Sequence, residues 1–579
     1  MDSWITDSQI SSRFPYYTRA NADEVGPDPF SPLGWSLGWM KGCIPGVAQG
    51  FINFGVLRAE EFALDPPEVF GNWGGYFYNQ LSLPRLMGCR MPGATPAAID
   101  QAYFGDHPGV PEYVAHPQDE DAGQSEKLAG TMAWAMSTDS FPAMDEAAAL
   151  ARRLVSERPD LAAISDSELV ARGRAMAPAI VAVWAPYCEV CLGASLGPGA
   201  VQAICAAIGR PDDAVKVLAA VGDIESAETS FAMWDLSRLI KNSGELMEAF
   251  DGEVAAVLAR LASSSSADAV AFLAAWRQLV AEHGHRGPNE WDMRAPSWTT
   301  RPTLPLSMLE RLRHQHDDRS PHLARAAAAA TRQALTTDLL AAVAGDPETS
   351  ATLTAGLSSS ALFYALRERG KSACIRVIHE AKLAFNELGR RMVARGVFDD
   401  ELQMFMLLDD ELDAFLADPQ SFRDVIQQRS VSFEHLHQLE PPYIVKLEDG
   451  VAPIDSWPLR FGAGDVVQAV AGELLQGAPG APGVVTGRAR IILDPAAADD
   501  LQPDDIMVAA TTDPSWTPLF LSVAGVIVNV GAVASHAVIV SRELGVPCAV
   551  SVVDATKRIP EGAMVTIDGS SGAVIVVSV

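Results

Sequence analysis

The sequence predicts a multidomain protein in which a mainly α-helical region is followed by a smaller α/β domain. Its 579 residues are enough for several domains, because a single domain usually holds about 100–200 residues. Residues 129–344 are rich in alanine and repeat apolar side chains at helical spacing. Nearer the C-terminus, residues 525–528 form a short apolar run typical of a strand, and residues 537–544 follow a helical pattern.

The composition is that of an ordinary globular protein, with 48% hydrophobic and 20% charged residues. A net charge of −30 argues against a nucleic acid or an anionic membrane as partner, since both bind basic surfaces. The seven cysteines are odd in number and scattered, which favours a reducing cytoplasm over a disulfide framework. The N-terminus lacks the basic and then apolar pattern of a signal peptide. We therefore expect a cytoplasmic protein.

The N-terminal part crowds aromatic side chains among glycine and proline. Trp35, Trp39, Phe51 and Trp73 belong to this group. Such a cluster either forms a core or lines a pocket for an apolar or aromatic ligand. These four side chains are the candidates for substrate binding.

Two other stretches have a plain structural interpretation. Cys188 and Cys191 form an isolated C-x-x-C pattern; a zinc site needs a second pair of ligands, so helix packing is favoured and no metal site is expected. Residues 514–541 contain no charged side chain, as a membrane span would. Pro518, Asn529 and His536 within that stretch favour a buried strand and a turn instead.

A polar turn at residues 283–290 reads His-Gly-His-Arg-Gly-Pro-Asn-Glu. On irregular backbone that faces a cleft, His283 and His285 are candidates for a general base, Arg286 for an anion clamp, and Glu290 for contact with the substrate. The alternative is a capped loop whose polar groups satisfy each other.

Arg367 and Lys371 stand four residues apart in a helical pattern. They therefore project from one face of the helix and together can grip a phosphoryl group. The alternative is a solvated basic face.

His536 lies where the strand pattern of residues 525–528 turns into the helical pattern of 537–544. Gly531 supplies a flexible turn, and Ser535 is a natural N-cap. An imidazole nitrogen is a nucleophile near neutral pH, and the N–H groups of a first helical turn stabilise an anionic adduct. The alternative is a polar residue at a helix cap with no chemical role.

From residue 477 to the C-terminus, the chain resembles the swivelling phosphohistidine domain of phosphoenolpyruvate synthases, pyruvate phosphate dikinases and rifampicin phosphotransferases. Four motifs in order carry the resemblance: 482–489 (PGVVTGRA), 512–520 (TDPSWTPLF), 535–547 (SHAVIVSRELGVP), and Asp568-Gly569 with Gly572. The resemblance implies that His536 is phosphorylated and passes the group on, supported by Gly531, Ser535 and Arg542.

Two departures from these families stand beside the histidine. Gly531-Ala532 replaces the usual Gly-Gly pair, and Ala534 replaces a Thr or Met. Neither change removes the nucleophile. The missing threonine argues against regulation by phosphorylation next to His536.

Other segments resemble rifampicin phosphotransferases. Residues 17–25 with 29–33 are similar to the start of their substrate-binding domain, residues 283–290 with Pro296-Ser297-Trp298 to a shared loop, and residues 367–412 to a helical segment. The resemblance implies that Arg367 and Lys371 meet the phosphohistidine.

These patterns divide the chain into three parts. We expect a mainly helical acceptor-binding domain over residues 1–466, a Pro/Gly-rich hinge over 467–483, and the swivelling phosphohistidine domain over 484–579. A hinge with proline limits slack while it allows the histidine to visit two sites.

No nucleotide-binding stretch such as G-x-x-x-x-G-K-S/T is recognised in the sequence, whereas the related enzymes normally carry an ATP-grasp domain. The resemblance therefore implies a hetero-oligomer in which a separate ATP-grasp subunit binds ATP and Mg²⁺ and phosphorylates His536. This split arrangement resembles phenylphosphate synthase and the methylphenyl phosphate synthases of cresol breakdown, and an aromatic-rich pocket fits a small phenol. The chain would then be a kinase-type transferase of aromatic degradation. The alternatives are phosphorylation of a rifamycin-type antibiotic and a non-catalytic regulatory phosphocarrier.

Overall fold

The computed structural model of the chain describes residues 3–64, 67–104, 109–222, 224–460, 466–493, 498, 501–513, 516–531 and 535–579. A mainly helical region precedes a C-terminal α/β region, as the sequence predicts. The chain forms two compact units, and each is assembled from three separate segments. Unit 1 comprises Met1–Gly193, Trp291–Ala295 and Gly370–Gly464, and unit 2 comprises Ala194–Glu290, Pro296–Arg369 and Asp465–Val579.

Unit 1 is built from helices around a small antiparallel sheet. Its helices are α1 (Ala22–Val25), the π-helix η1 (Gly34–Cys43), α2 (Ile44–Phe54), η2 (Ala59–Glu61), α3 (Ser82–Arg90), α4 (Pro96–Phe104), α5 (Ala122–Ser137), α6 (Pro142–Ser156), α7 (Asp166–Gly193), η5 (Glu401–Met406), η6 (Asp409–Glu411), α17 (Leu412–Ala417), η7 (Pro419–Phe422), α18 (Arg423–Leu436) and η8 (Ile454–Ser456). The sheet has the order β2 (Phe70–Trp73), β3 (Tyr76–Gln80), β1 (Tyr16–Thr18) and β4 (Ile444–Lys446). Gly74 and Gly75 join β2 to β3 with φ of 58° and 76°, the left-handed backbone that a two-residue hairpin turn requires.

Close packing of α2 on α7 holds unit 1 together. A Cβ atom on Gly46 would collide with Trp184, and one on Gly50 would collide with Cys188. Glycine at both positions therefore lets the two helices approach closely, and the C-x-x-C cysteine Cys188 packs in this interface. That contact is the helix-packing role expected for it.

The helical part of unit 2 precedes its sheet in the chain. These helices are α8 (Leu196–Ala207), α9 (Pro211–Val217), α10 (Glu225–Lys241), α11 (Gly244–Phe250), η3 (Val254–Ala256), α12 (Val257–Ala262), α13 (Ala267–His283), α14 (Thr303–Leu312), η4 (Asp317–Arg319) and α15 (Pro321–Ala342). The long helix α16 (Pro347–Ala394) begins in unit 2 and continues into unit 1.

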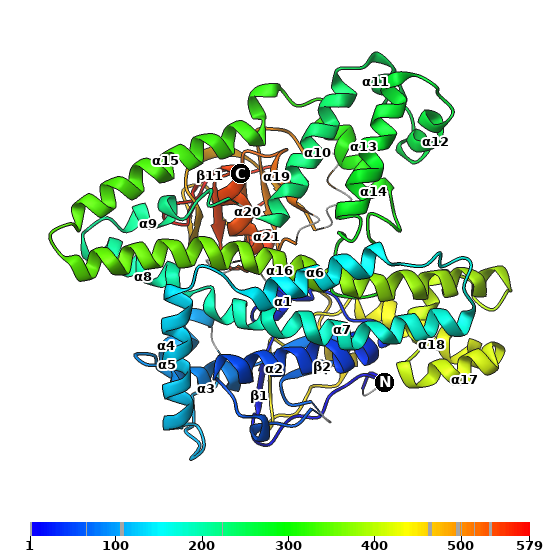
Figure 1. Cartoon of the computed structure of the whole chain (residues 1–579), viewed down its shortest axis with the longest axis horizontal. Helices are drawn as coiled ribbons and strands as arrows, with labels where there is room; N and C mark the ends of the chain where they lie inside the picture. The colour runs from blue at the N-terminus through cyan, green and yellow to red at the C-terminus, as the bar shows by residue number, and fades with distance from the viewer. Residues whose placement is uncertain are drawn as a thin grey trace. The chain divides into compact units, whose positions relative to one another are not determined.

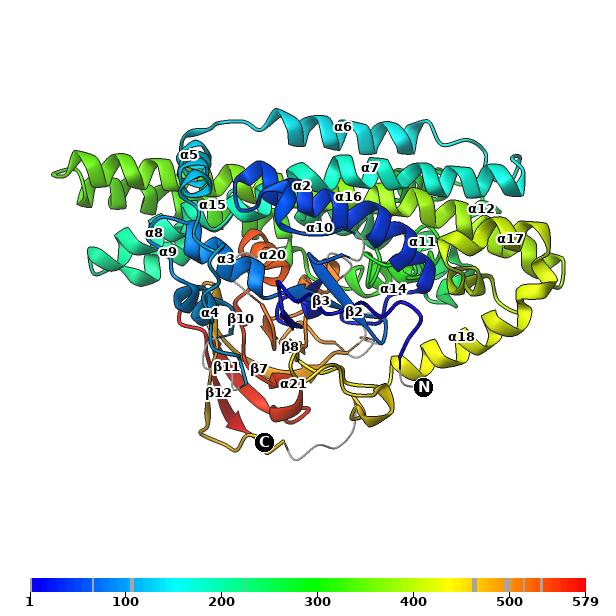
Figure 2. The same ribbon diagram turned by 90° about the horizontal axis from the view of Figure 1, so that it is seen from below.

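An eight-stranded sheet forms the C-terminal part of unit 2, and Figure 2 shows its strands β7, β11 and β12 next to one another. The order is β5 (Leu474–Gln476), β12 (Ala573–Ser578), β11 (Met564–Asp568), β7 (Val484–Ile491), β8 (Asp505–Ala509), β9 (Gly525–Val528), β10 (Cys548–Val550) and β6 (Ala478–Ala481). Strands β7 to β10 run parallel, and the flanking pairs are antiparallel. Helices α19 (Thr517–Phe520) and α20 (His536–Leu544) connect the parallel strands β8, β9 and β10, and α21 (Ala555–Arg558) lies between β10 and the antiparallel strand β11.

The stretch expected to be a hinge, residues 467–483, contributes both edge strands of this sheet. β5 pairs with β12 at one edge, and β6 pairs with β10 at the other. Pro479 lies within β6 opposite Ala549. The Pro/Gly-rich segment is therefore part of the sheet rather than a separate connection.

The two faces of the sheet bury different apolar clusters. Val526 and Val528 of β9 pack into a cluster shared with helices α10, α13, α14 and α15, whereas Ile527 packs into a second cluster on the opposite face. This alternation follows from the two-residue period of a strand. Helix α20 packs against both α10 and α15, and Figure 1 shows it beside them. His536 thus begins a helix that lies between the sheet and the helical part of unit 2.

One helical stretch among the described residues, Asp166–Ala207, is long and apolar enough to span a membrane. However, 56% of its most apolar window is buried inside the protein, as in the core helix of a globular unit. Residues 525–528, within the uncharged stretch 514–541, form the buried strand β9, and residues 536–544 form α20. Pro514, Ser515 and residues 532–534 lie outside the described residues.

Candidate active site around His536

His536 is the first residue of α20 and is only 1% exposed. Its Nδ1 lies 3.2 Å from Thr512 Oγ1, and its Nε2 lies 3.1 Å from Thr517 Oγ1. In a neutral imidazole one nitrogen donates and the other accepts, so one hydroxyl accepts the ring N–H while the other donates to the ring lone pair. The edge-on ring of Phe520, 6.1 Å away between centroids, completes the contact. The ring is therefore held in one orientation.

Thr512 and Thr517 were not among the candidates from sequence, although both lie in the motif at residues 512–520. The motif was recognised, but only its threonine hydroxyls as residue types were visible in it, not their contacts with the imidazole of His536. This signal was too weak by itself, because a threonine near a helix start is more often a cap.

Gly531 and Ser535 shape the turn before His536. A Cβ atom on Gly531 would lie 3.1 Å from both Ser535 Oγ and Val550 Cβ, so the close approach there favours glycine. Ser535 has the extended backbone of an N-cap, with φ of −68° and ψ of 160°, but its side chain makes no capping hydrogen bond. The expected capping role of the hydroxyl is therefore wrong, although the position is correct. Among the described residues, Ser535 Oγ is buried without a partner.

Arg542 is buried on the same helix and binds within the fold. Its Nε donates to the carbonyl of Gly480 in β6 at 2.7 Å, and its Nη1 lies 3.4 Å from Tyr364 Oη on α16. These contacts anchor α20, which is one way for Arg542 to support the histidine.

The polar turn at residues 283–290 is buried in unit 2. His283, His285, Arg286 and Glu290 are each at most 6% exposed. Thr229 Oγ1 lies 3.2 Å from His283 Nδ1, and Arg286 Nη1 lies 3.6 Å from Glu290 Oε1. Within the turn, Arg286 and Glu290 therefore form a buried ion pair, which is one contact of the kind that the structural alternative expects.

One contact links this turn to the motif that holds His536. The backbone N–H of Asn289 donates to Asp513 Oδ2 at 3.3 Å. Asp513 directly follows Thr512, whose hydroxyl contacts the imidazole. Asn289 has a positive φ of 50°, a backbone conformation that asparagine tolerates better than most residues. The structure thus brings together two segments that are 224 residues apart in the sequence.

Arg367 and Lys371 are both on α16 and both largely buried. The Arg367 side chain is 17% exposed and its Nη1 lies 2.6 Å from Glu368 Oε1. Lys371 is 9% exposed, and its Nζ lies 5.9 Å from the ring centroid of Trp291. Their burial disfavours a simple solvated basic face. Arg367 belongs to unit 2 and Lys371 to unit 1.

Three of the four aromatic candidates are buried in the core of unit 1. Trp35 stacks on Trp39 in the π-helix with centroids 5.7 Å apart, and Trp39 packs on Phe77 at 4.6 Å. Trp73 packs separately, on Tyr17 at 4.9 Å. Phe51 in α2 is half-buried. This placement favours the core role for the three tryptophans.

Asp292, two residues beyond the polar turn, fixes the start of the π-helix. Its Oδ1 accepts from Ser31 Oγ at 2.7 Å, and Gly34 packs directly on its carboxylate. Burial raises the pKa of Asp292, while the hydroxyl and N–H of Ser31 oppose that shift.

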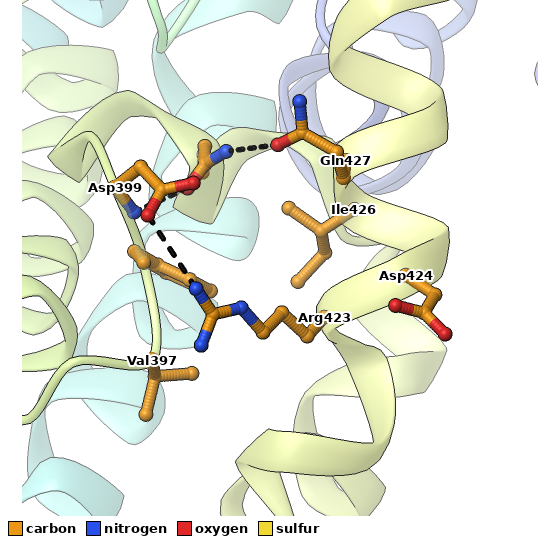
Figure 3. A pocket seen from close by; sticks show the side chains of 8 residues that line it. Val397, Asp399, Arg423, Asp424, Ile426 and Gln427 are labelled. Atoms are coloured by element: carbon orange, nitrogen blue, oxygen red, sulfur yellow. Dashed lines mark hydrogen bonds and ion pairs between the residues drawn. The ribbon is translucent and has the colours of Figure 1, made fainter.

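A surface cavity of about 250 Å³ lies elsewhere, beside α18 in unit 1. Figure 3 shows Arg423 directed toward Asp399, and their charged groups are 3.5 Å apart. Gln403 Nε2 donates to Gln427 Oε1 at 3.1 Å nearby. None of the residue candidates from sequence lines this cavity. Across the described residues, no group of three or more His, Cys, Asp or Glu side chains is placed to hold a metal ion.

Comparisons with known proteins place this geometry among phosphotransferases. Residues 178–368 match the rifampicin phosphotransferase fourth domain, and residues 501–572 match the mobile domain of PEP-utilising enzymes. The second match contains Thr512, Thr517 and His536. The first contains the polar turn and Arg367. Both matches support a phosphotransferase.

Three relatives illustrate the similarity. An uncharacterised protein of Mycobacterium tuberculosis is 27% identical over 99% of this chain and 62% of its own length. A rifampicin phosphotransferase of Streptomyces sviceus is 30% identical over 62% of this chain and 41% of its own length. A prodigiosin synthesizing transferase of Serratia marcescens is 26% identical over 62% of this chain and 40% of its own length. The chain therefore spans less than two thirds of the length of each of these relatives.

Proposed function

We propose that this chain is the acceptor-binding and phosphohistidine-carrying component of an ATP-dependent phosphotransferase. His536 carries the phosphoryl group, a separate ATP-grasp subunit charges it with ATP and Mg²⁺, and the acceptor is the hydroxyl of a small phenol in the cytoplasm. The observation that supports this most directly is the imidazole of His536, fixed at the start of α20 by two threonine hydroxyls, within the segment that matches a PEP-utilising mobile domain.

The two threonines suit a nucleophilic imidazole. In the charging step, a lone pair on one ring nitrogen forms an N–P bond while the P–O bond to the donor breaks, and the donor keeps that electron pair. The hydroxyl that faces the other nitrogen accepts its N–H and keeps the ring oriented. The hydroxyl beside the reacting nitrogen must turn aside as the phosphoryl group arrives.

The transfer step needs a base and positive charge. The acceptor oxygen forms the new P–O bond while the N–P bond breaks, and the electron pair of that bond returns to the imidazole. The hydroxyl proton passes to a base, for which His283 and His285 are the candidates. Arg367 and Lys371 would neutralise the charge that spreads over the phosphoryl oxygens. The contact of Asn289 with Asp513 joins the polar turn at residues 283–290 to the motif that contacts His536, and this supports the assignment of the base.

A second candidate acceptor is a rifamycin-type antibiotic. The match of residues 178–368 to a rifampicin phosphotransferase domain favours it, as does the relative of that name in Streptomyces sviceus.

The test uses the purified chain with ATP labelled in the β- or the γ-phosphoryl group, with and without an ATP-grasp partner protein. We expect an acid-labile, base-stable label that requires the partner and is absent from His536→Ala. A chase with a panel of phenols and with a rifamycin then identifies the acceptor by loss of label from the protein. No label under any condition contradicts the phosphohistidine, label without a partner contradicts the separate charging subunit, and label that no acceptor discharges favours a regulatory phosphocarrier.

A further inference from the structure

Two acidic side chains flank His536 and contact the helical part of the same unit. The histidine region comprises residues 465–579 and the helical segment comprises residues 194–290 with 296–369, both within unit 2. We propose that Asp513 and Glu543 are positioning residues that dock the histidine region on the helical segment for phosphoryl transfer. The inference rests on the proposed function of His536.

Glu543 provides the first contact. It lies seven residues after His536 on α20, so the two side chains share one helix face. Glu543 is 2% exposed, and its Oε1 accepts from the backbone N–H of Val221 at 2.8 Å. Burial raises the pKa of the Glu543 carboxyl, and the N–H groups of Val221 and Gly222 and the charge of Arg325 oppose that shift. A buried carboxylate is tolerated only with such partners, so this contact is specific to the docked arrangement.

Asp513 provides the second contact, on the other sequence side of the histidine. Its Oδ2 accepts from the backbone N–H of Asn289 at 3.3 Å. The adjacent Thr512 contacts the Nδ1 of His536. A displacement of Asp513 would therefore move the hydroxyl that orients the imidazole.

The two contacts share one chemistry. In each, the helical segment offers a backbone N–H from an irregular stretch of chain, and the histidine region offers a carboxylate. When the histidine region leaves the helical segment, water can hydrate both carboxylates and both N–H groups. The separation therefore leaves no buried charge unpaired. Contacts of this kind are strong enough to orient a docked domain and weak enough to break once per catalytic cycle.

Close backbone packing accompanies the Glu543 contact. α20 ends at Gly545, which has φ of 68°, and a Cβ atom there would lie 3.5 Å from the Cβ of Ala324 in α15. The helix end that carries Glu543 is therefore seated on the helical segment without an intervening side chain.

Amide hydrogen exchange on the full-length chain tests docking without any phosphotransfer. In Glu543→Ala the amide of Val221 should exchange roughly tenfold faster, and in Asp513→Ala the amide of Asn289 should do the same, since each loses a charged acceptor. Glu543→Gln keeps an acceptor oxygen and should restore part of the protection. The matched control is Glu561→Ala: Glu561 accepts from Arg490 at 2.6 Å within the histidine region, so this variant should leave both amides unchanged.

Two results would overturn the proposal. One is unchanged exchange at Val221 and Asn289 in the alanine variants. The other is an equal loss of protection throughout β7, β8 and β9, which would mean that the carboxylates stabilise the fold of the histidine region and not its docking.

Kinetics then connect docking to the reaction. With the charging partner and a discharging acceptor, Glu543→Ala should lower kcat for transfer roughly tenfold, with KM for the acceptor and the rate of His536 labelling unchanged. The double variant Glu543→Ala with Asp513→Ala should lower kcat roughly a hundredfold if the two contacts act independently. Equal slowing of labelling and transfer in Glu543→Ala would contradict a docking role. If His536 takes no label even in the unsubstituted chain, the proposed function fails while the exchange result still stands.

Discussion

Two buried carboxylates of unit 1, Glu380 and Asp409, are each held by two charged partners, whereas each ring nitrogen of His536 in unit 2 meets one neutral hydroxyl. Glu380, which is fully buried, pairs with both Arg158 and Arg172. Asp409 pairs with Arg174 at 2.8 Å and also with Lys41. His536, by contrast, meets one hydroxyl on each nitrogen at 3.1 to 3.2 Å.

The difference has a physical meaning. An ion pair with two guanidinium groups is strong and directional, and removal of one partner leaves an uncompensated charge. A single hydrogen bond to a hydroxyl or a backbone N–H contributes about 1 kcal/mol net and exchanges easily with water. The ion pairs of Glu380 and Asp409 are therefore suited to a fixed structure, whereas the hydrogen bonds of His536 are suited to partners that are exchanged during a reaction.

The largest effect should come from His536→Ala. We expect complete loss of phosphoryl label, at least about 1,000-fold below the unsubstituted chain, because the variant lacks the nucleophile. Thermal stability should fall modestly, since the variant loses the hydrogen bonds to Thr512 and Thr517 and the packing of the buried ring on Phe520. Retention of base-stable label on the variant would place the phosphoryl group on another residue.

Glu380→Ala should have the opposite profile. We expect a loss of about 3 kcal/mol in the free energy of unfolding, at the low end for a broken buried ion pair, because Arg158 retains some exposure to water. Urea denaturation measures it, with Glu387→Ala as a partly exposed comparison on the same helix. Labelling of His536 per folded molecule should stay normal. A loss below 1 kcal/mol would mean that the ion pairs of Glu380 are no stronger than the hydrogen bonds of His536.

Arg367→Ala and Lys371→Ala should each slow transfer from phospho-His536 to the acceptor about 100-fold, a usual cost for the loss of one charge-stabilising group. Charging by the ATP-grasp partner should continue, so phospho-His536 should accumulate. Single-turnover transfer with quenched-flow sampling measures the rate. Arg369→Ala, two residues away and on a different face of α16, is the control. Equal effects in all three variants would point to a general loss of positive charge.

The smallest effect should come from Thr517→Val and Thr512→Val. Each removes one hydroxyl from one imidazole nitrogen, and we expect a roughly tenfold lower labelling rate from the poorer ring orientation. The ¹⁵N chemical shifts of His536 should also change in opposite senses in the two variants, because each releases a different ring nitrogen. Identical spectra from the two variants would contradict the proposed role of the hydroxyls.

The sequence predicted local structure well where the pattern itself was local. The strand at residues 525–528 and the helix predicted over 537–544, which begins one residue earlier at His536, were both found, because the periods of a strand and of a helix are visible within a few residues. The helical character of residues 129–344 was found for the same reason.

Contacts between distant segments could not be predicted. Asn289 and Asp513 each lie in a motif, but nothing in either motif indicates that one N–H binds the other carboxylate. The sequence left two roles for Trp35 and Trp39, in a core or in a pocket. Only the packing of Trp39 on Phe77 and of Trp35 on Trp39 favours the core. The π-helix that stacks these two tryptophans has no sequence signal of its own. Ser535 shows a subtler limit, since its position was predicted but the direction of its hydroxyl was not.

The proline in β6 has a consequence for solubility. β6 is an edge strand, and an edge strand with free N–H and C=O groups can pair with a sheet of another molecule. Pro479 has no N–H to offer and cannot extend such a ladder. If the histidine region leaves the helical segment during each cycle, this edge should resist strand-to-strand aggregation while newly exposed apolar surface is in water. We therefore expect Pro479→Val to precipitate more readily at high concentration, with no change in the chemistry at His536.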